Sequence, residues 1–488
     1  MMKLVSKLVA IILLFTLFAT PTFHNPAVVS AAESNANWME QVYSSTPEFG
    51  KQTLREVILP GTHDSGTATM DDANDPRDPG PDFWDLKNLV QNAAAQAGKS
   101  IVADWSQTQG LTIEEQLNEG IRYLDLRVAP NVWQPVFDSY QIQETNLRTL
   151  HGLYGEGVNE IIADTKTFLD ENEKEIVILD FQHFYEMTER SYEYLNTLLQ
   201  DTFGDLLVPS SYGVNIPLEQ LWSENKRVIV LYGSDHQRYT DTLDIRSLYA
   251  EEFNSWIWDR KTNMQSRWAN TTDVTVLKNT LDEAIESASQ NKFFVLQGVL
   301  TADDNAIVDA VLGGIDPFSA TAVDSLHDLV RLANNEIPNW VQNDWADEPL
   351  NIIMMDWFEE TDIVNIIKNM NEGKTFDGPD KDDFTLVATI SSEGGPQSGQ
   401  KHRSSNNFTT VNVPANTEKL YWEISGNTNA DAISFSVKED VAIWTDPIVF
   451  NSLKSGSYTS VKKNDSFYIA DPRNTGGKSF TVKIYAVK

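Results

Sequence analysis

The chain has 488 residues, contains no cysteine and carries a formal net charge of −34 at pH 7. This length exceeds the roughly 250–300 residues over which a single hydrophobic core grows, so two folded units are expected. The lack of cysteine excludes disulfides, thiolate nucleophiles and cysteine-ligated zinc. The acidic balance argues against nucleic acid as a partner, because binding phosphates requires clustered Lys and Arg.

The first 32 residues have the pattern of a secretion signal. Lys3 and Lys7 precede an apolar run at residues 8–18, and small residues follow at 29–32. This pattern predicts a signal peptide that is cleaved on export, and therefore a secreted, extracellular protein. A membrane anchor is the alternative reading, but the apolar run is shorter than the roughly 20 residues that span a bilayer.

Residues 33–372 alternate between short apolar, β-rich runs and stretches of helical periodicity. The runs predict strands at residues 56–59, 123–128, 147–150, 176–181, 227–231, 255–258, 293–299 and 352–357. The helical stretches lie at residues 112–118, 158–169, 191–199, 274–288, 322–332 and 361–370. Eight such units indicate an α/β fold, an irregular (β/α)8 TIM-like barrel. A doubly wound sheet built from the same elements is the alternative.

The last quarter of the chain has a different pattern. Residues 373–383 are polar, with Gly, Pro and a charge run, and are predicted to be a linker. Short alternating segments then lie at residues 384–390, 408–413, 420–424, 432–437, 448–450, 457–461, 466–469 and 479–487, separated by Asn, Gly, Ser and Pro. Residues 384–488 therefore predict a C-terminal all-β sandwich, an accessory domain whose partner the sequence leaves open.

Polar residues gather where the expected strands end. They are His63, Asp64, Asp125, Arg127, His151, Asp180, His183 and Asp356. The carboxyl ends of barrel strands meet on one face, where the active sites of this architecture lie, so these side chains are expected to converge. Two histidines with an arginine and carboxylates favour phosphoryl chemistry by general acid–base catalysis, with the arginine neutralising the phosphate.

Four ordered segments carry a resemblance to a known family. They are Leu59-Pro60-Gly61-Thr62-His63-Asp64-Ser65-Gly66, Gly120-Ile121-Arg122-Tyr123-Leu124-Asp125-Leu126-Arg127, Leu150-His151-Gly152 and Ile176-Val177-Ile178-Leu179-Asp180-Phe181-Gln182-His183-Phe184-Tyr185. Together they resemble the X domain of phosphatidylinositol-specific phospholipases C, as in the secreted bacterial enzymes. The last segment is similar in particular to the phospholipase C X-domain-containing branch.

The resemblance implies a role for each residue of the acid/base pair. His63 is expected to be the general base that takes the proton of the inositol 2-hydroxyl, with Asp356 holding its imidazole. His151 is expected to be the general acid that protonates the leaving diacylglycerol oxygen, assisted by Asp64. The implied enzyme is a phosphatidylinositol phospholipase C that releases diacylglycerol and a cyclic inositol phosphate.

The second strand bears on metal dependence. Calcium-dependent relatives place two acidic ligands there, one residue apart, whereas this chain has Asp125 followed by Arg127. A further acidic ligand expected after the fourth strand looks replaced by Gln182. Because calcium needs several oxygen ligands, Arg127 is expected to bind the phosphoryl oxygens in place of a metal, with Asp125 positioning the network. No metal and no other cofactor is expected.

The head-group contacts depart from the resemblance. Asp125, Asp180, His183 and Tyr232 are the candidate substrate-binding residues. Secreted bacterial relatives tend to carry a lysine after the fourth strand, and residues 182–184 contain none; the fifth strand also ends without a basic residue. The expected substrate is therefore phosphatidylinositol or a related inositol lipid at a membrane interface, with a glycosylated anchor or another phosphodiester left open.

Two other functions remain as alternatives. A glycerophosphodiester phosphodiesterase also uses a barrel and histidines, but it requires a metal and a cluster of acidic ligands. A non-catalytic, secreted lipid- or carbohydrate-binding protein would have no need for an acid/base pair. Trp84, Trp105 and Trp133 follow the first two strands and are either core residues or contacts to a lipid interface, where indole rings are favoured.

Overall fold

The computed structural model describes residues 34–70, 103, 105–133, 141–236, 255–302, 325–374, 381, 384–392, 409–411, 413–439, 448–461 and 466–487. The predicted signal peptide, most of the predicted linker and Trp84 lie outside these residues. Residues Asn35–Lys488 form one unit. No helix of the described residues is long and apolar enough to cross a membrane.

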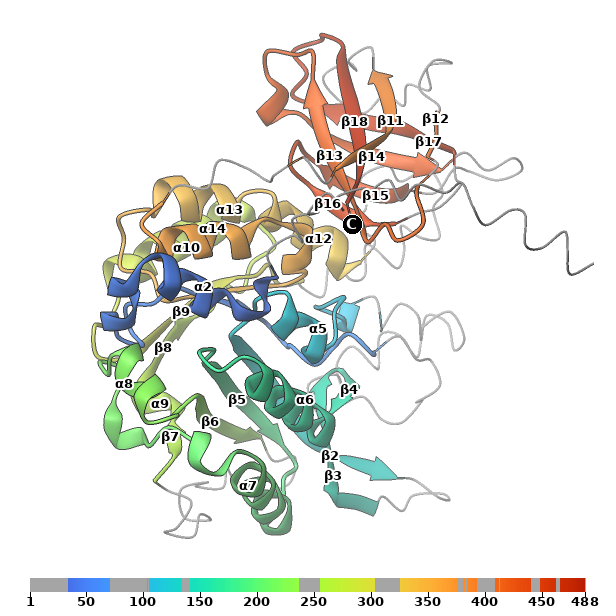
Figure 1. Cartoon of the computed structure of the whole chain (residues 1–488). Coiled ribbons are helices and arrows are strands. Elements are labelled where there is room, and N and C mark those ends of the chain that lie inside the picture. Colours follow the sequence, from blue (N-terminus) through green and yellow to red (C-terminus); the bar gives the residue numbers. More distant parts are fainter. Residues whose placement is uncertain are drawn as a thin grey trace, which may run out of the picture. The chain divides into compact units, whose positions relative to one another are not determined.

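Eight parallel strands form the sheet of the first domain (Figure 1). Their order is β7-β6-β5-β2-β1-β10-β9-β8, so that β7 and β8 lie at the two ends. The strands are β1 (Leu59–Thr62), β2 (Tyr123–Trp133), β5 (Val177–Tyr185), β6 (Val228–His236), β7 (Ile257–Asp259), β8 (Met264–Arg267), β9 (Phe293–Gly298) and β10 (Ile352–Met355). This confirms the prediction of an irregular TIM-like barrel.

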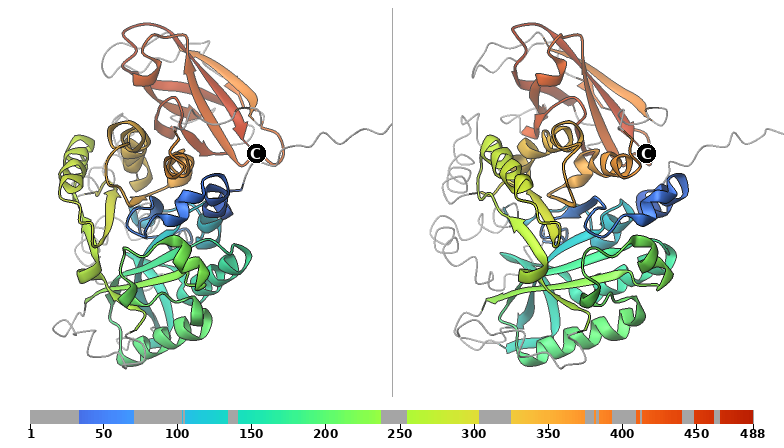
Figure 2. Two further views of the ribbon diagram at one scale, coloured as in Figure 1. Left: turned by 60° about the vertical axis from the view of Figure 1, so that its left-hand side comes forward. Right: turned by 90° about the vertical axis from the view of Figure 1, so that its left-hand side faces the viewer.

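Helices cover the outer face of this sheet (Figures 1 and 2). The longer ones are α2 (Trp38–Ser45), α6 (Val158–Glu171), α7 (Glu189–Phe203), α10 (Val274–Glu286), α12 (Leu326–Asn334) and α14 (Ile363–Asn371), and the shorter ones α5 (Ile113–Asn118), α8 (Leu218–Ser223), α9 (Arg260–Asn263) and α13 (Ile337–Asn339). The capping box predisposes α5 to begin where it does: the Thr112 hydroxyl accepts from the Glu115 amide while the Glu115 carboxylate accepts from the Thr112 amide.

The strand prediction was wrong at three places. Residues 147–150 belong to β3 (Gln141–His151), which pairs antiparallel with β2 and with β4 (Leu153–Gly157), outside the path of parallel strands. The eighth parallel strand is β8, which was not predicted because its sequence Met-Gln-Ser-Arg is short and mostly polar. The first strand begins at Leu59, three residues later than predicted, and includes Pro60 and Gly61, whose low strand propensity hid it.

Strand alternation divides the core into two layers. In β5, Val177 and Leu179 belong to the cluster that packs against the helices, whereas Ile178 belongs to the cluster inside the barrel. In β2, Leu124 points outward and Tyr123 inward in the same way. Because successive side chains of a strand face opposite sides, this alternation decides which polar residues near the strand ends can reach the barrel interior.

The C-terminal domain is a sandwich of two antiparallel four-stranded sheets (Figure 2), as predicted. One sheet has the order β11-β18-β13-β16, with β11 (Thr385–Ser392), β18 (Phe480–Val487), β13 (Lys419–Ser425) and β16 (Tyr458–Ser460). The other has the order β12-β17-β14-β15, with β12 (Thr409–Thr410), β17 (Ser466–Arg473), β14 (Ser434–Glu439) and β15 (Ile448–Leu453). Trp422 is fully buried in the core.

Candidate active site

His63 follows β1, and both of its ring nitrogens face charged groups. Nδ1 lies 2.9 Å from Asp356 Oδ1, while Nε2 lies 3.0 Å from Arg127 Nη2 and 3.1 Å from Asp64 Oδ2. A carboxylate only accepts, so the proton on Nδ1 is assigned from the contact with Asp356. Nε2 accepts from Arg127 when the ring is neutral and donates to Asp64 when it is protonated. The contacts fit both states of a residue that exchanges a proton at Nε2.

The electrostatic surroundings favour the protonated form of His63. Burial opposes the charged imidazole, but the Asp64 and Asp356 carboxylates outweigh it and raise the pKa of His63 to about 9. At pH 7 this leaves only about one ring in a hundred neutral. Its partners hold the His63 ring in place. Because only the neutral ring can accept a proton, its small neutral fraction limits general base catalysis at neutral pH.

Asp64 lies at the centre of the site, next to both histidines. Its carboxylate is 2.7 Å from Arg127 Nε, 3.1 Å from His63 Nε2 and 3.3 Å from His151 Nε2. Burial opposes its ionisation, but Arg127 and the two imidazoles outweigh burial and lower its pKa. Its backbone has a φ of 42°, a left-handed conformation that strains a non-glycine residue and is typical of functional sites.

His151 is brought to this site by the β3–β4 hairpin. The hairpin approaches the loop after β1 so closely that a side chain at Gly155 would place its Cβ 2.0 Å from the Gly66 carbonyl oxygen. His151 Nδ1 lies 2.7 Å from the Ser106 carbonyl oxygen and Nε2 faces Asp64. Since both neighbours accept, His151 can donate to both only when its ring is protonated, and burial disfavours this form by lowering the pKa of His151 below its ordinary value.

The geometry allows general acid–base chemistry on a phosphodiester. The rings of His63 and His151 lie 6.0 Å apart, and the Arg127 guanidinium lies beside both Asp64 and His63. One imidazole can accept a proton at Nε2 while the other donates one, and the cation can bind the charge that develops on the phosphoryl oxygens. His63, Arg127, His151 and Asp356 line one cavity of about 470 Å³.

Several known proteins are similar in sequence to this chain. No family model matches the chain. The human PI-PLC X domain-containing protein 3 is 28% identical over 341 residues, which are 69% of this chain and 93% of that protein. The human PI-PLC X domain-containing protein 2 is 31% identical over 288 residues, which are 59% of this chain and 84% of that protein. The chain belongs to the PI-PLC X domain-containing family.

More distant proteins also match parts of the chain. The variant-surface-glycoprotein phospholipase C of Trypanosoma cruzi is 26% identical over 319 residues, 62% of this chain and 76% of that protein. Among solved structures, the phosphatidylinositol-specific phospholipase C from Listeria monocytogenes is 17% identical, with a TM-score of 0.43 and coverage of 70% of this chain and all of that one.

A second charged network lies behind the cavity lining, next to Gln182. The Arg260 Nε donates to both Asp180 oxygens, at 3.0 and 2.8 Å, and Tyr123 also donates to Asp180 at 2.6 Å. The Gln182 amide links this network to Asp125: oriented to satisfy both neighbours, its nitrogen donates to Asp125 Oδ1 at 3.0 Å and its oxygen accepts from Arg260 Nη2 at 3.2 Å. Asp180 thus holds the Arg260 guanidinium next to Gln182.

The surroundings of Asp125 disfavour its ionised form. Burial, and then the neighbouring Asp64 carboxylate, raise its pKa to about 7 in spite of Arg127. Asp125 is therefore partly protonated near neutral pH. Its Oδ2 also accepts from the Asp64 amide at 3.3 Å, so it helps to hold the strained backbone of the central carboxylate.

A bulge in β5 decides which side chains of this strand line the cavity. Between β2 and β5 the pairing moves from Leu126↔Phe181 to Arg127↔His183, leaving Gln182 as an extra residue. Gln182 and His183 both line the cavity as a result, together with Tyr185.

Tyr232 was wrongly assigned to substrate binding. Its neighbour Leu231 faces the barrel interior, so Tyr232 points outward, where it is 3% exposed and packs edge-on against Phe181. Its hydroxyl donates to Asn196 of α7 at 2.9 Å. The strand end was located correctly, but a shift of one residue along a strand changes the face.

Several residues of the site were missed because they come from loops and helices rather than strand ends. Arg260 begins α9, Ser106 is helical, and Gln109 lies in the loop before α5. The Gln109 side chain donates to the His63 carbonyl at 2.9 Å and to the Met355 carbonyl at 3.0 Å, joining the ends of β1 and β10. No local pattern in the sequence marks these residues. For Arg260, the only sign was that no basic residue was found at the ends of the predicted fourth and fifth strands.

Three groups of the X domain lie close enough to share a metal ion. Ligand atoms of His63, Asp64 and Asp125 all lie within 4.8 Å of one another. The Arg127 guanidinium contacts two of the three, at 2.7 Å from Asp64 and 3.0 Å from His63, and a divalent cation among them would face this fixed positive charge at close range. The residues present do not fit a metal ion in this arrangement.

One wall of the cavity is apolar. Trp268, Leu300, Ala302 and Leu326 line it opposite the charged residues. Trp268 is 54% exposed, and its indole nitrogen donates to the Thr301 hydroxyl at 2.8 Å. Trp105, considered as a lipid contact from its position in the sequence, is instead only 5% exposed.

Proposed function

We propose that this protein is a phosphatidylinositol phospholipase C that acts without a metal ion. The observation that carries the proposal is Asp64 placed between His63, His151 and Arg127, within 3.3 Å of each. A site built only to bind a ligand does not need two imidazoles that share one carboxylate. Family membership supports the reaction class, a phosphodiester cleavage.

In the proposed reaction the inositol 2-hydroxyl attacks phosphorus. His63 Nε2 takes the hydroxyl proton as the new oxygen–phosphorus bond forms, and Asp356 stabilises the resulting imidazolium. His151 Nε2 gives a proton to the glycerol oxygen as its bond to phosphorus breaks. Arg127 binds the phosphoryl oxygens, on which negative charge accumulates in the transition state. Diacylglycerol and a cyclic inositol phosphate leave, and the two histidines have exchanged protonation states.

The substrate is proposed to be phosphatidylinositol or a glycosylated inositol lipid. Among the residues that line the cavity, Gln182 and His183, which are backed by the buried Asp125 and Asp180, support a polyhydroxylated head group, and the apolar lining residues support the first carbons of the lipid. A glycosylated lipid is included because the related Trypanosoma cruzi phospholipase is named for a variant surface glycoprotein. Export from the cell, proposed from residues 1–32, would place the enzyme where it meets membranes from outside.

Phosphorus NMR of the products tests the proposal. Phosphatidylinositol micelles with the wild-type protein are expected to yield a cyclic phosphate, with EDTA present or absent. His63→Ala and His151→Ala are each expected to lower the rate by at least about 100-fold, because proton transfer by a positioned side chain contributes 10²–10⁴-fold. Their thermal unfolding should stay close to that of the wild type.

Other outcomes of that experiment point to other functions. A phosphatidate product that disappears with EDTA would indicate a metal-dependent diesterase of the glycerophosphodiesterase type. No phosphorus product from phosphatidylinositol, phosphatidylcholine or a glycosylated inositol lipid would indicate a binding protein.

A further inference from the structure

One face of α12 grips the loop that carries Asp356. His327, Arg331 and Asn334 are spaced four and three residues apart and therefore share a face of the helix. The Asn334 amide donates to the Asp356 carbonyl at 2.8 Å and to the Trp357 carbonyl at 3.2 Å. The helix thus holds the backbone directly after the carboxylate that supports His63.

The gripped loop has a strained conformation. Trp357 has a φ of 38°, a left-handed backbone that is costly for a bulky side chain. The His327 ring stacks on Trp357 at 4.3 Å with an angle of 16°, and His327 Nε2 lies 2.9 Å from Glu360. Arg331 donates to both oxygens of Glu360, each at 2.8 Å. Such a loop keeps its shape only while these contacts persist.

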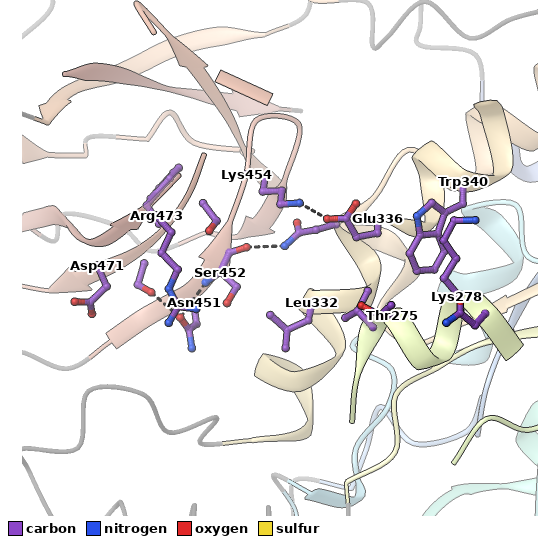
Figure 3. A pocket seen from close by; sticks show the side chains of 16 residues that line it. Thr275, Lys278, Leu332, Glu336, Trp340, Asn451, Ser452, Lys454, Asp471 and Arg473 are labelled. Carbon is purple, nitrogen blue, oxygen red and sulfur yellow. Dashed lines mark hydrogen bonds and ion pairs between the residues drawn. The ribbon is translucent and has the colours of Figure 1, made fainter. Parts of the chain in front are cut away.

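The C-terminal end of α12 and the residues that follow it contact the sandwich (Figure 3). Asn335, which follows the helix, donates to the Ser452 carbonyl at 2.6 Å and accepts from the Ser457 hydroxyl at 3.2 Å. Glu336 forms an ion pair with Lys454. The Arg331 guanidinium, already bonded to Glu360, lies 5.9 Å from the ring centre of Phe450.

The sandwich also reaches the same loop directly. The Tyr458 hydroxyl of β16 donates to Asp362 Oδ1 at 3.1 Å, just before α14 begins. The segment 356–362 is therefore held by α12 on one side and by the sandwich at its end.

We propose that the sandwich is a positioning part of the catalytic site: by clamping α12 and Asp362 it holds Asp356 beneath His63. The kinetic half of this inference rests on the proposed function, while the geometric half does not. Asn334, Asn335 and Tyr458 are positioning residues, which act on the reaction only through Asp356.

Full-length variants that weaken the clamp test this inference. Asn335→Ala, Lys454→Met and Tyr458→Phe are made singly and together, and the protein with all three is the combined variant. The control variants are Lys478→Met and Tyr485→Phe, at positions on the sandwich outside the described contacts with α12 and residues 356–362. The substrate is a short-chain phosphatidylinositol kept monomeric, so that surface binding by the sandwich does not contribute. The combined variant is expected to lose about ten-fold in kcat, because small misplacements of a catalytic group are costly, with KM within about two-fold.

A second readout does not depend on turnover. Histidine NMR follows the titration of the His63 ring, whose signal is identified by its loss in His63→Asn. In the combined variant, and in Asn334→Ala as a reference, the His63 titration is expected to move to lower pH, because one of its two carboxylates is displaced. Asn334→Asp, which keeps the shape of the side chain but not its donor, should resemble Asn334→Ala.

The outcomes separate the two proposals. An unchanged kcat and an unchanged His63 titration in the combined variant, with only a lower unfolding temperature, would overturn the positioning role. A change in KM alone would do the same and favour a role in substrate binding. A wild-type protein without phospholipase activity, but with a His63 titration that responds to the clamp, would refute the proposed function and leave the geometric inference standing. Tyr458→Phe removes a single hydroxyl, so it gives an answer even if the combined variant does not fold.

Discussion

At the scale of single residues, the two histidines differ in what faces Nδ1. His63 meets the Asp356 carboxylate, whereas His151 meets the Ser106 carbonyl. A negative charge stabilises an imidazolium more than a carbonyl dipole does, so the two pKa values move in opposite directions although both rings share Asp64. The proposed base has the higher pKa and the proposed acid the lower one, and only a minor form of the free protein is reactive.

This arrangement predicts the pH dependence of kcat/KM. Activity requires neutral His63 and protonated His151. The reactive fraction falls as pH drops through the pKa of His151, below 6.5, since His63 then stays protonated while His151 gains no further proton. It falls again above about pH 9, where His63 is neutral but His151 loses its proton. A bell-shaped profile with a broad, flat top is expected in initial rates on monomeric substrate.

The upper limb should move when the support of His63 is removed. Asp356→Asn eliminates the carboxylate, so the limb near pH 9 is expected to shift to lower pH while the rate at the top falls. A profile whose upper limb stays in place in Asp356→Asn would show that another group sets it.

At the scale of elements, the β5 bulge and its partner strand determine part of the cavity lining. Gly233 of β6 lies against Gln182, and a side chain there would place its Cβ 1.9 Å from the Gln182 carbonyl oxygen. The backbone approach that positions the Gln182 amide between Asp125 and Arg260 therefore depends on the missing side chain.

Gly233→Ala is expected to displace the bulge. The forced shift should destabilise the fold by about 1–3 kcal/mol, as overpacking of a core does, and lower activity by more than the fraction unfolded explains. Urea unfolding gives the first quantity and initial rates below the transition give the second. Wild-type activity together with wild-type stability would mean that β5 and β6 do not approach as closely as the structure has them.

The elements differ in how far the sequence could predict them. Apolar runs such as 176–181 and 293–299 predict buried strands because burial on both faces requires continuous apolar sequence. Met264–Arg267 lacks such a run, and its pairing with β9 is a tertiary effect. His63, Arg127 and His151 were recognisable from their motifs, whereas Gln109 comes from a loop, Arg260 from the short helix α9 and Asn334 from the end of α12, and none of the three belongs to a motif. The prediction for Tyr232 was wrong because the sequence did not show which residues of that strand face the barrel interior.

At the scale of the whole molecule, charge governs how the protein approaches a membrane. A formal charge of −34 repels anionic lipid surfaces over distances set by the Debye length, about 30 Å at 0.01 M salt and about 8 Å at 0.15 M. Short-range contacts of apolar side chains such as Trp268 act only once this repulsion is screened.

Binding to anionic vesicles is therefore expected to rise with salt. Sedimentation with phosphatidylinositol-containing vesicles should recover several-fold more protein at 0.15 M than at 0.01 M salt, opposite to the behaviour of a basic protein. Neutral phosphatidylcholine vesicles provide the control and should show little salt dependence. Weaker binding at higher salt would reveal a local basic surface that overrides the net charge.

The pairing of β1 with β10 also determines when activity can arise. His63 and Asp356 are 293 residues apart, and the tyrosine that anchors the loop after Asp356 comes only at position 458. His63 therefore cannot meet its carboxylate until residue 356 of the 488 has been synthesised, and the loop after Asp356 gains its tyrosine anchor only at residue 458. Under the proposed function, a newly made chain is expected to be inactive towards lipids until most of it has left the ribosome.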